Sequence, residues 1–399
     1  MPVKKKKAKG GGKKKGGKKK AAKAAAEKEE ELIKCRAFLK AYQRNCILPG
    51  RICSPELVKL LKEGIVGEKP APVKFALDGS TVAQSSGSPD PTTPPTRKML
   101  QPLADSWVET KYSFVRCLYV WNLALDDDAI VSLALYFESA VGITMKALEI
   151  REAGLSPWAI SRLARSLRRV QLSSLNLDYN SIPQASLVQL CDGLRFSRTI
   201  QTLSLNFCEI NSHCGEILGS YIATSGVREV SLIGNTLTCY GCSELIKPLV
   251  VVICEAIESL IPTPTEHSDK AEGETKIEPA PLPPPPALTK LFLQDNSIDV
   301  HSPCSKGSFN SVLCTREIKK LLMSSACLEE LRLEGNSIGD GGAREVMEGL
   351  TLRKEGGLPT MRVGVTSCVS PDLFAAIVEL TSSKAAKKKG KKKRKKKKK

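Results

Sequence analysis

Two stretches of the chain share one pattern of leucine, isoleucine and asparagine. Residues 172–182 read Leu172-Ser-Ser-Leu175-Asn-Leu177-Asp-Tyr-Asn180-Ser-Ile182, and residues 328–338 read Leu328-Glu-Glu-Leu331-Arg-Leu333-Glu-Gly-Asn336-Ser-Ile338. A repeat of roughly 30 residues is typical of a solenoid, in which each unit buries its apolar face against its neighbours. We count about eight copies. The weaker ones begin at Val115, Met145, Ile200, Val227, Leu288 and Leu358.

Each half of the repeat has its own period. The L-x-L segment alternates as a strand does, whereas the later apolar positions, such as Ile182, Ser186 and Leu190, step by four as a helix does. A small residue in the middle lets the helix approach the strand. We therefore predict an α/β solenoid with parallel strands on the concave face and helices on the convex face. The small residues are Ala129, Ala159, Ser186, Cys214, Gly241 and Gly342.

These copies resemble ribonuclease-inhibitor-type leucine-rich repeats over roughly residues 115–380. The resemblance implies a horseshoe in which an asparagine after each strand hydrogen-bonds the backbone of the turn. It also implies that the concave face is the side that binds partners. The asparagine positions that match are Asn180, Asn235, Asn296 and Asn336, and those that depart are Leu123, Ala153, Cys208 and Thr366.

Composition divides the rest of the chain into segments. Residues 27–66 have apolar spacing and a Ser54-Pro55 helix start that predict a helical hairpin. Residues 67–97 are rich in Pro, Ser, Thr and Gly, so we predict a linker. The repeat domain is then expected to span residues 98–380, with a disordered insertion at 262–287. Two polylysine tails, 1–26 and 381–399, are predicted to be disordered.

The net charge of +19 is concentrated at the two ends of the chain. Residues 1–26 hold 12 Lys and residues 384–399 hold 13 Lys and Arg, and neither segment holds an acid. The body between them has 36 basic and 42 acidic residues and is net −6. Such tails attract any polyanion without reading sequence, so an acidic polymer such as tubulin tails or RNA is the expected partner. A solubilising or targeting role without a fixed partner is the alternative.

The residues between and just after the strand leucines are expected to be exposed on the concave face. Aromatic side chains in such positions are typical of protein interfaces, so we predict a protein partner there. The alternative is that the hairpin or the linker covers part of this face, with Trp121 inside a cap. The predicted partner-binding residues are Tyr119, Trp121, Arg151, Asp178, Tyr179, Asn206, Phe207, Phe292, Arg332 and Glu334. Two rows fill out the face: Tyr119, Glu149, Asn176, Ser204, Ser231, Phe292, Arg332 and Arg362, and then Trp121, Arg151, Asp178, Asn206, Ile233, Gln294 and Glu334.

Enzymatic and metal-dependent functions have little support in the sequence. The 14 Cys are scattered singly and favour reduced thiols. Cys239-Tyr-Gly-Cys242 lacks a second ligand pair, so structural cysteines are favoured over zinc. Three His residues offer no general-base arrangement. We therefore expect no enzyme activity, no metal and no cofactor, and no apolar run long enough to span a membrane.

These features together predict a non-enzymatic protein-binding scaffold. Lysine tails, a helical lead-in and a late insertion are similar in layout to leucine-rich repeat proteins of ciliary and flagellar axonemes, as is the stretch from Glu109 to Phe114. A cytoskeletal adaptor in the cytoplasm, in a cilium or flagellum, is therefore the leading hypothesis. The alternatives are a nuclear or nucleolar RNA-associated scaffold and a regulator of a GTPase or nuclease that binds through the concave face.

Overall fold

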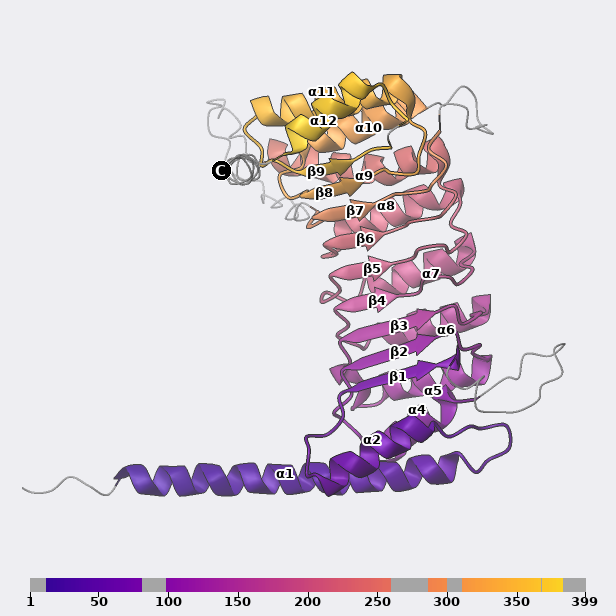
Figure 1. Cartoon of the computed structure of the whole chain (residues 1–399), viewed down its shortest axis with the longest axis vertical. Helices are drawn as coiled ribbons and strands as arrows, with labels where there is room; N and C mark the ends of the chain where they lie inside the picture. Colours follow the sequence, from indigo (N-terminus) through magenta and orange to yellow (C-terminus); the bar gives the residue numbers. More distant parts are fainter. Residues whose placement is uncertain (1–11, 81–97, 260–285, 300–310, 367, 383–399) are drawn as a thin grey trace, which may run out of the picture.

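The computed structural model describes residues 12–80, 98–259, 286–299, 311–366 and 368–382. Within them, nine parallel strands form one sheet in sequence order, and the helices between the strands line the other side of the stack (Figure 1). This is the predicted α/β solenoid. The strands are β1 (Lys74–Asp78), β2 (Cys117–Trp121), β3 (Ala147–Arg151), β4 (Ser174–Asn176), β5 (Thr202–Ser204), β6 (Glu229–Ser231), β7 (Lys290–Phe292), β8 (Glu330–Arg332) and β9 (Arg362–Gly364).

Helices alternate with these strands along the chain. Two short 3-10 turns, Gly142–Thr144 and Ser212–Cys214, adjust the spacing before β3 and α8. The helices are α1 (Gly12–Asn45), α2 (Pro55–Val66), α4 (Leu100–Glu109), α5 (Asp127–Glu138), α6 (Pro157–Leu167), α7 (Gln184–Leu194), α8 (Gly215–Thr224), α9 (Thr238–Glu258), α10 (Ser311–Ser324), α11 (Gly339–Glu355) and α12 (Pro371–Thr381).

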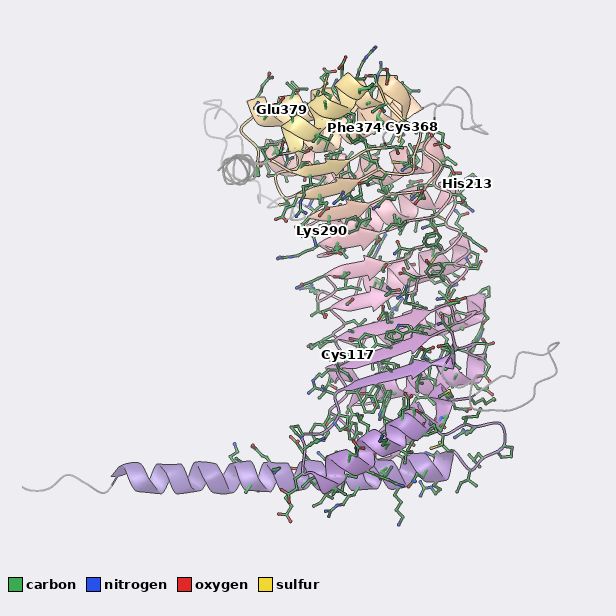
Figure 2. The ribbon with its side chains drawn as sticks, in the orientation of Figure 1. Cys117, His213, Lys290, Cys368, Phe374 and Glu379 are labelled. Carbon is green, nitrogen blue, oxygen red and sulfur yellow. The ribbon has the colours of Figure 1, made fainter. Side chains whose placement is uncertain are left out.

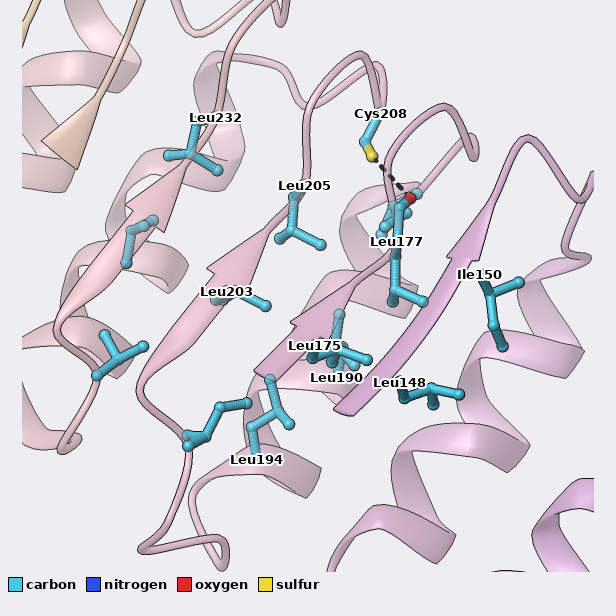
Figure 3. Close-up of a cluster of buried hydrophobic side chains, with 14 of the residues drawn as sticks. Leu148, Ile150, Leu175, Leu177, Leu190, Leu194, Leu203, Leu205, Cys208 and Leu232 are labelled. Carbon is cyan, nitrogen blue, oxygen red and sulfur yellow. Dashed lines mark hydrogen bonds between the residues drawn. The ribbon is translucent and has the colours of Figure 1, made fainter. Parts of the chain in front are cut away.

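The core is a ladder of apolar side chains in register from strand to strand. Leu148, Leu175 and Leu203 occupy equivalent positions on β3, β4 and β5, and all three are buried (Figure 3). Leu190 of α7 lies in the same cluster and is also buried. Since the pattern repeats, one continuous core runs the length of the stack, which is how a solenoid offsets the small core of each unit.

An aromatic cap closes the N-terminal end of the core. Helix α1 packs on α2 and α4, and it crosses the end of the stack next to β1 (Figure 1). Phe38 of α1 lies with its ring centroid 5.9 Å from Phe75 of β1 and 4.7 Å from Tyr112, and Phe75 lies 5.0 Å from Trp107. The hairpin of α1 and α2 therefore covers the end of the solenoid, where α1 packs on α4.

The predicted linker at 67–97 is wrong for its first part, because β1 lies within it. Lys74–Asp78 pairs in parallel with β2, and Phe75 and Leu77 point into the core. These two residues are the L-x-L of a further repeat in which Pro72 takes the position of the first leucine. The Pro and Ser content of the whole segment concealed this short alternation. Residues 81–97 lie outside the described part.

The boundary predicted for the first lysine tail is also corrected. Helix α1 begins at Gly12, so residues 12–26 belong to the helix and not to a disordered tail. Ala and Lys, which make up most of this stretch, are strong helix formers. The acid-rich segment from Glu27 to Glu31 continues the helix into the cap. Residues 1–11, 260–285, 300–310 and 383–399 lie outside the described residues; they include part of the first predicted tail and most of the second tail and of the predicted insertion.

The last repeat begins two residues later than predicted. Leu331 of β8 pairs with Val363, and Arg332 pairs with Gly364. The copy therefore starts at Thr360 and not at Leu358, because the turn at Gly356 and Gly357 lengthens the connection from α11. Arg362 accordingly lies beside Glu330, and the asparagine-equivalent position is Cys368, not Thr366.

Close contact between helices depends on glycine in the middle of the stack. A Cβ on Gly219 of α8 would lie 2.4 Å from the carbonyl oxygen of Leu245 in α9, and a Cβ on Gly215 would lie 2.0 Å from that of Gly241. Both distances are shorter than van der Waals contact with backbone atoms, which cannot move aside independently. The helices α8 and α9 therefore pack backbone to backbone.

Gly219→Ala is expected to lower the free energy of unfolding by about 1–3 kcal/mol, because overpacking forces the two helices apart. Gly64→Ala in α2 is the control, since a Cβ there meets nothing within 4 Å. The control substitution is expected to stabilise the protein by roughly 0.5–1 kcal/mol through helix propensity. Urea denaturation of both variants measures the difference, and equal effects at the two positions would contradict close packing of α8 on α9.

Candidate protein-binding surface

The strand face carries two rows of side chains that point away from the helices. The register runs from Tyr119 through Glu149, Asn176 and Ser204 to Phe292 and Arg332 in the first row, as the sequence predicts. Arg362 is the exception, because Gly364 occupies its predicted place. Along the stack, the side chains of these rows differ in aromatic content, in their ion pairs and hydrogen bonds, and in solvent exposure. These differences locate the candidate site.

An aromatic cluster lies at the N-terminal part of this face; it consists of Tyr119, Trp121, Arg151, Tyr179 and Phe207. The rings of Tyr119 and Trp121 are 5.7 Å apart, and those of Tyr179 and Phe207 stack in parallel at 4.8 Å. The guanidinium of Arg151 lies 6.0 Å over the Tyr179 ring and joins the two pairs. Tyr179 and Phe207 are 46% and 43% exposed, so two large rings of a rigid sheet face solvent. Trp, Tyr and Arg are the residue types most enriched among energetically dominant interface residues.

Two hydrogen-bond donors in this cluster are buried without a partner in the described part of the chain. They are Nε1 of Trp121 and Nε of Arg151. Within the described residues Arg151 forms one ion pair, a long one of 3.9 Å from its Nη1 to Oε1 of Glu149. A buried polar group without a partner costs roughly 1–3 kcal/mol, so a ligand that supplies an acceptor gains that amount on binding.

The same residues line a pocket of about 300 Å³ at the ends of the first strands. Its walls are Asp78, Trp121, Asn122, Arg151, Glu152 and Tyr179. Trp121 and Arg151, the two residues with unpartnered donors, thus both contribute to the walls of a hollow large enough for one side chain. The carboxylates of Asp78 and Glu152 at its walls make a neutral acceptor, such as a backbone carbonyl or a side-chain amide, a better fit than an anion.

The backbone under the exposed rings is in an unfavourable conformation. Tyr179 and Phe207 have φ of 60° and 53°. The left-handed region is rare for bulky residues and costs on the order of 1 kcal/mol. The next repeat has Gly234 at this position, and the Phe207 ring lies where a side chain on Gly234 would be. The equivalent residues of four other repeats, Asn122, Glu152, Asp295 and Gly335, also have positive φ, so this conformation belongs to the turn of the repeat and is not peculiar to the aromatic cluster.

Two of the predicted binding residues hold the sheet together. Asp178 is buried; its Oδ1 accepts hydrogen bonds from Ser204 Oγ at 2.7 Å and from the backbone N of Asn206 at 2.8 Å. Asn206 repeats the arrangement with Ser231 Oγ and the backbone N of Ile233. Each of these two side chains hydrogen-bonds residues of the next repeat. Because Asp178 is buried in this arrangement, the expectation that it is exposed is wrong. Together Asp178 and Asn206 form a rigid base under Tyr179 and Phe207.

The C-terminal part of the strand face is charged and internally paired. Arg332 donates to Glu330 and to Glu334 at 2.6 and 2.9 Å, and the pKa of Arg332 is raised first by Glu334 and then by Glu330. Lys290 pairs with Glu229 at 2.9 Å. These charged groups are paired, although Oε2 of Glu334 and Oε1 of Gln294 are also buried without a partner in the described residues. The aromatic cluster differs because its unpartnered atoms are donors and lie beside exposed rings. Phe292 is half-buried among the charged groups, and the candidate site is therefore the aromatic cluster.

The asparagine positions form a ladder behind the strand ends. Asn180 accepts from the backbone N of Ala153 and donates to the carbonyl oxygens of Ile150 and Leu177. Asn235 and Asn336 make the same set of bonds to their preceding repeats. Asn296 donates to Leu232 and Gln294, but its Oδ1 has no partner in the described residues. At position 208 the thiol of Cys208 donates to Leu177 O instead (Figure 3).

The cysteines of the C-x-x-C segment lie in the core. Cys239 and Cys242 are buried on α9, and the neighbouring thiol of Cys314 has a raised pKa because it hydrogen-bonds Cys242 and is desolvated. Among the described residues, no three His, Cys, Asp or Glu side chains are placed to hold a metal ion. His213 lies at the loop edge of the stack (Figure 2).

The chain is similar in sequence to a curated protein over about half of its length. The ribonuclease inhibitor of the pig, Sus scrofa, is 26% identical over 235 residues, which are 52% of this chain and 49% of the relative. The fold is a leucine-rich-repeat solenoid of the ribonuclease-inhibitor type. The chain thus spans about half the length of this relative, and no family model matches it. The likeness supports a protein-binding scaffold at the level of the repeat family.

Membrane insertion has no support among the described helices. None of them combines the length and the apolar composition that a bilayer crossing needs. The helix α9, which has 21 residues, contains Lys247, Glu255 and Glu258.

Proposed function

We propose that the protein is a non-enzymatic scaffold that binds a protein partner through the aromatic cluster of the strand face. The observation that carries this proposal is the pair of buried, unpartnered donors, Trp121 Nε1 and Arg151 Nε, between exposed aromatic rings. A partner segment that inserts a carbonyl or amide oxygen satisfies both donors and covers Tyr179 and Phe207. The similar pig protein is an inhibitor of a ribonuclease by name, which supports the same proposal of a protein partner.

A site-specific crosslink tests this proposal without knowledge of the partner. p-Benzoylphenylalanine is placed at Phe207 in the full chain, and at Trp158 of α6 as a control that is equally exposed but lies on the helix side. Illumination in cells is expected to give discrete protein adducts from position 207 that position 158 does not give. The same adducts from both positions, or none from position 207, would overturn the proposal.

Trp121→Phe is expected to weaken partner binding while leaving the fold intact. The ring remains to pack against Tyr119, but the Nε1 donor is lost. Since that donor has no partner within the protein, its removal is expected to leave stability unchanged or raise it by about 1 kcal/mol. Adduct yield from position 207 should fall several-fold, and thermal unfolding should not shift downward. A lower melting temperature with undiminished adducts would assign Trp121 a structural role only.

We further propose that the lysine-rich ends tether this scaffold to an acidic polymer, with the cytoskeleton of a cilium or flagellum as the first candidate. The support is the 25 basic residues without an acid at the two ends. In addition, α1 carries the sequence from Gly12 onward past the side of the stack (Figure 1). The lysine-rich ends can then bind the acidic polymer while the strand face binds its protein partner.

Localisation separates this proposal from its alternatives. The tagged full chain is compared with a variant lacking residues 1–11 and 383–399 in a ciliated cell. Axonemal signal that survives detergent and is lost in the truncation supports tethering. Nuclear signal that ribonuclease disperses would favour the RNA-associated scaffold instead, and diffuse signal with a GTPase or nuclease crosslinked to position 207 would favour the regulator.

A further inference from the structure

A second surface, the arginine edge, lies where helices end and strands begin. It is formed by the turns that follow α6, α7 and α8, on the edge of the stack where Figure 2 labels Cys117 and Lys290. All of its basic side chains are exposed. It comprises Arg168, Arg169, Arg195, Phe196, Arg198 and Arg228.

These residues come from three successive repeats and form one continuous surface. The guanidinium of Arg168 lies 4.5 Å from the centroid of the Phe196 ring in the next repeat. The carbonyl oxygen of Arg198 lies 3.8 Å from the Cβ position of Gly226, two residues before Arg228. The backbone N of Arg228 in turn donates to Gln201 O at 2.8 Å. Each turn therefore touches the next.

The positive charge of this edge is not neutralised locally. No described acidic group forms an ion pair with any of its five arginines; the nearby Glu138 pairs with Arg162 at 2.6 Å. The nearby acids are Asp192 on α7, Glu229, which follows Arg228 and pairs with Lys290, and Glu138, whose pKa is lowered first by Arg162 and also by Arg169. The body as a whole is net −6, so the concentration of arginine here runs against its average charge.

An exposed aromatic ring accompanies the charge. Phe196 is 62% exposed, more than any other aromatic side chain in the described residues. An acidic peptide would neutralise the arginines but leave this ring in water. A single-stranded nucleic acid satisfies both, because phosphates bind arginine forks and a base stacks on the ring.

We infer that the arginine edge binds single-stranded nucleic acid, with phosphates on the arginines and a base on Phe196. The site has no base-reading pocket, so binding is expected to be independent of sequence and steeply dependent on salt. This inference goes beyond the proposed function, because the edge is separate from the strand face. Unlike the lysine-rich ends, it offers a folded surface with a defined stacking position.

Fluorescence anisotropy with labelled oligouridine and oligothymidine tests the inference on the full chain. Because the lysine-rich ends also bind polyanions, the measurement is a comparison of variants over a range of salt concentrations. Arg195→Gln with Arg198→Gln is expected to weaken binding about tenfold and to reduce the log–log salt slope by roughly 1.4, for two phosphate contacts. The control is Lys59→Gln with Lys62→Gln on α2, which removes the same charge from an exposed helix and should leave binding and slope unchanged.

Phe196→Ala separates nucleic acid from an acidic protein ligand. It is expected to weaken oligouridine binding about tenfold at every salt concentration, since stacking on an aromatic ring is lost but no charge is. Ultraviolet crosslinking of 4-thiouridine RNA should map to the peptide that contains Phe196. If the control variant weakens binding as much as the arginine variant, the ends alone bind and the inference fails. It fails equally if polyglutamate competes fully and Phe196→Ala has no effect.

Discussion

Replacing Arg353 with leucine is expected to destabilise the solenoid by about 4 kcal/mol. Arg353 is 2% exposed and pairs with no carboxylate in the part of the chain that the structure describes; its guanidinium donates to four backbone carbonyls, those of Pro359, Leu322, Ser325 and Leu328. Leucine fills part of the volume but leaves these acceptors buried and unpaired. Burial lowers the pKa of Arg353, yet an arginine remains charged, so its hydrogen bonds persist at all ordinary pH values.

Guanidinium denaturation of Arg353→Leu measures this loss. Arg344→Leu is the matched control, because Arg344 lies on the same helix α11 but is exposed and is expected to change stability by less than about 0.5 kcal/mol. A loss below 1 kcal/mol at position 353 would contradict the inference that one side chain joins the ends of α10 and α11 to the start of β8.

Asn180→Leu is expected to cost about 3 kcal/mol, because the Asn180 side chain satisfies backbone groups of two repeats at once. Leucine is close in size, so the loss reports hydrogen bonds and not a cavity. Cys208→Asn is the complementary variant at the equivalent position of the next repeat, where only a thiol now donates. It is expected to be neutral or stabilising. A similar loss for both variants would mean that the position tolerates only its present residue.

The repeats that could be predicted from sequence are those with regular apolar spacing. The strands around Leu175 and Leu331 and the α/β solenoid follow from periods of two and four residues, which depend only on local geometry. Strand β1 was not predicted, because Pro72 occupies the position of the first leucine of its repeat. Arg362 was misplaced for a similar reason: Leu358 and Met361 imitate the repeat two residues out of register.

The candidate surfaces were harder to predict, because contacts between repeats decide them. Asp178 lies in a position that faces outward in the pattern, but Ser204 and Asn206 of the next repeat enclose it. The sequence pattern places Tyr119 and Trp121 on the strand face, where the structure has them. The unpartnered Nε atom of Arg151 is visible only in three dimensions. The arginine edge was missed altogether, since Arg168 and Phe196 are neighbours only after the helices stack.

The two ends of the stack differ in how firmly they are held. At the N-terminal end α4 buries Trp107 and five other residues beneath α1, whereas the final helix α12 buries Ile377 alone and leaves a hollow of about 740 Å³ against α11. Phe374 and Glu379 mark that end in Figure 2. A solenoid is stabilised by neighbour contacts only, so opening starts where these are fewest. The last repeats can therefore fray and re-form while the aromatic cluster, built on the capped end, remains assembled and able to hold its partner.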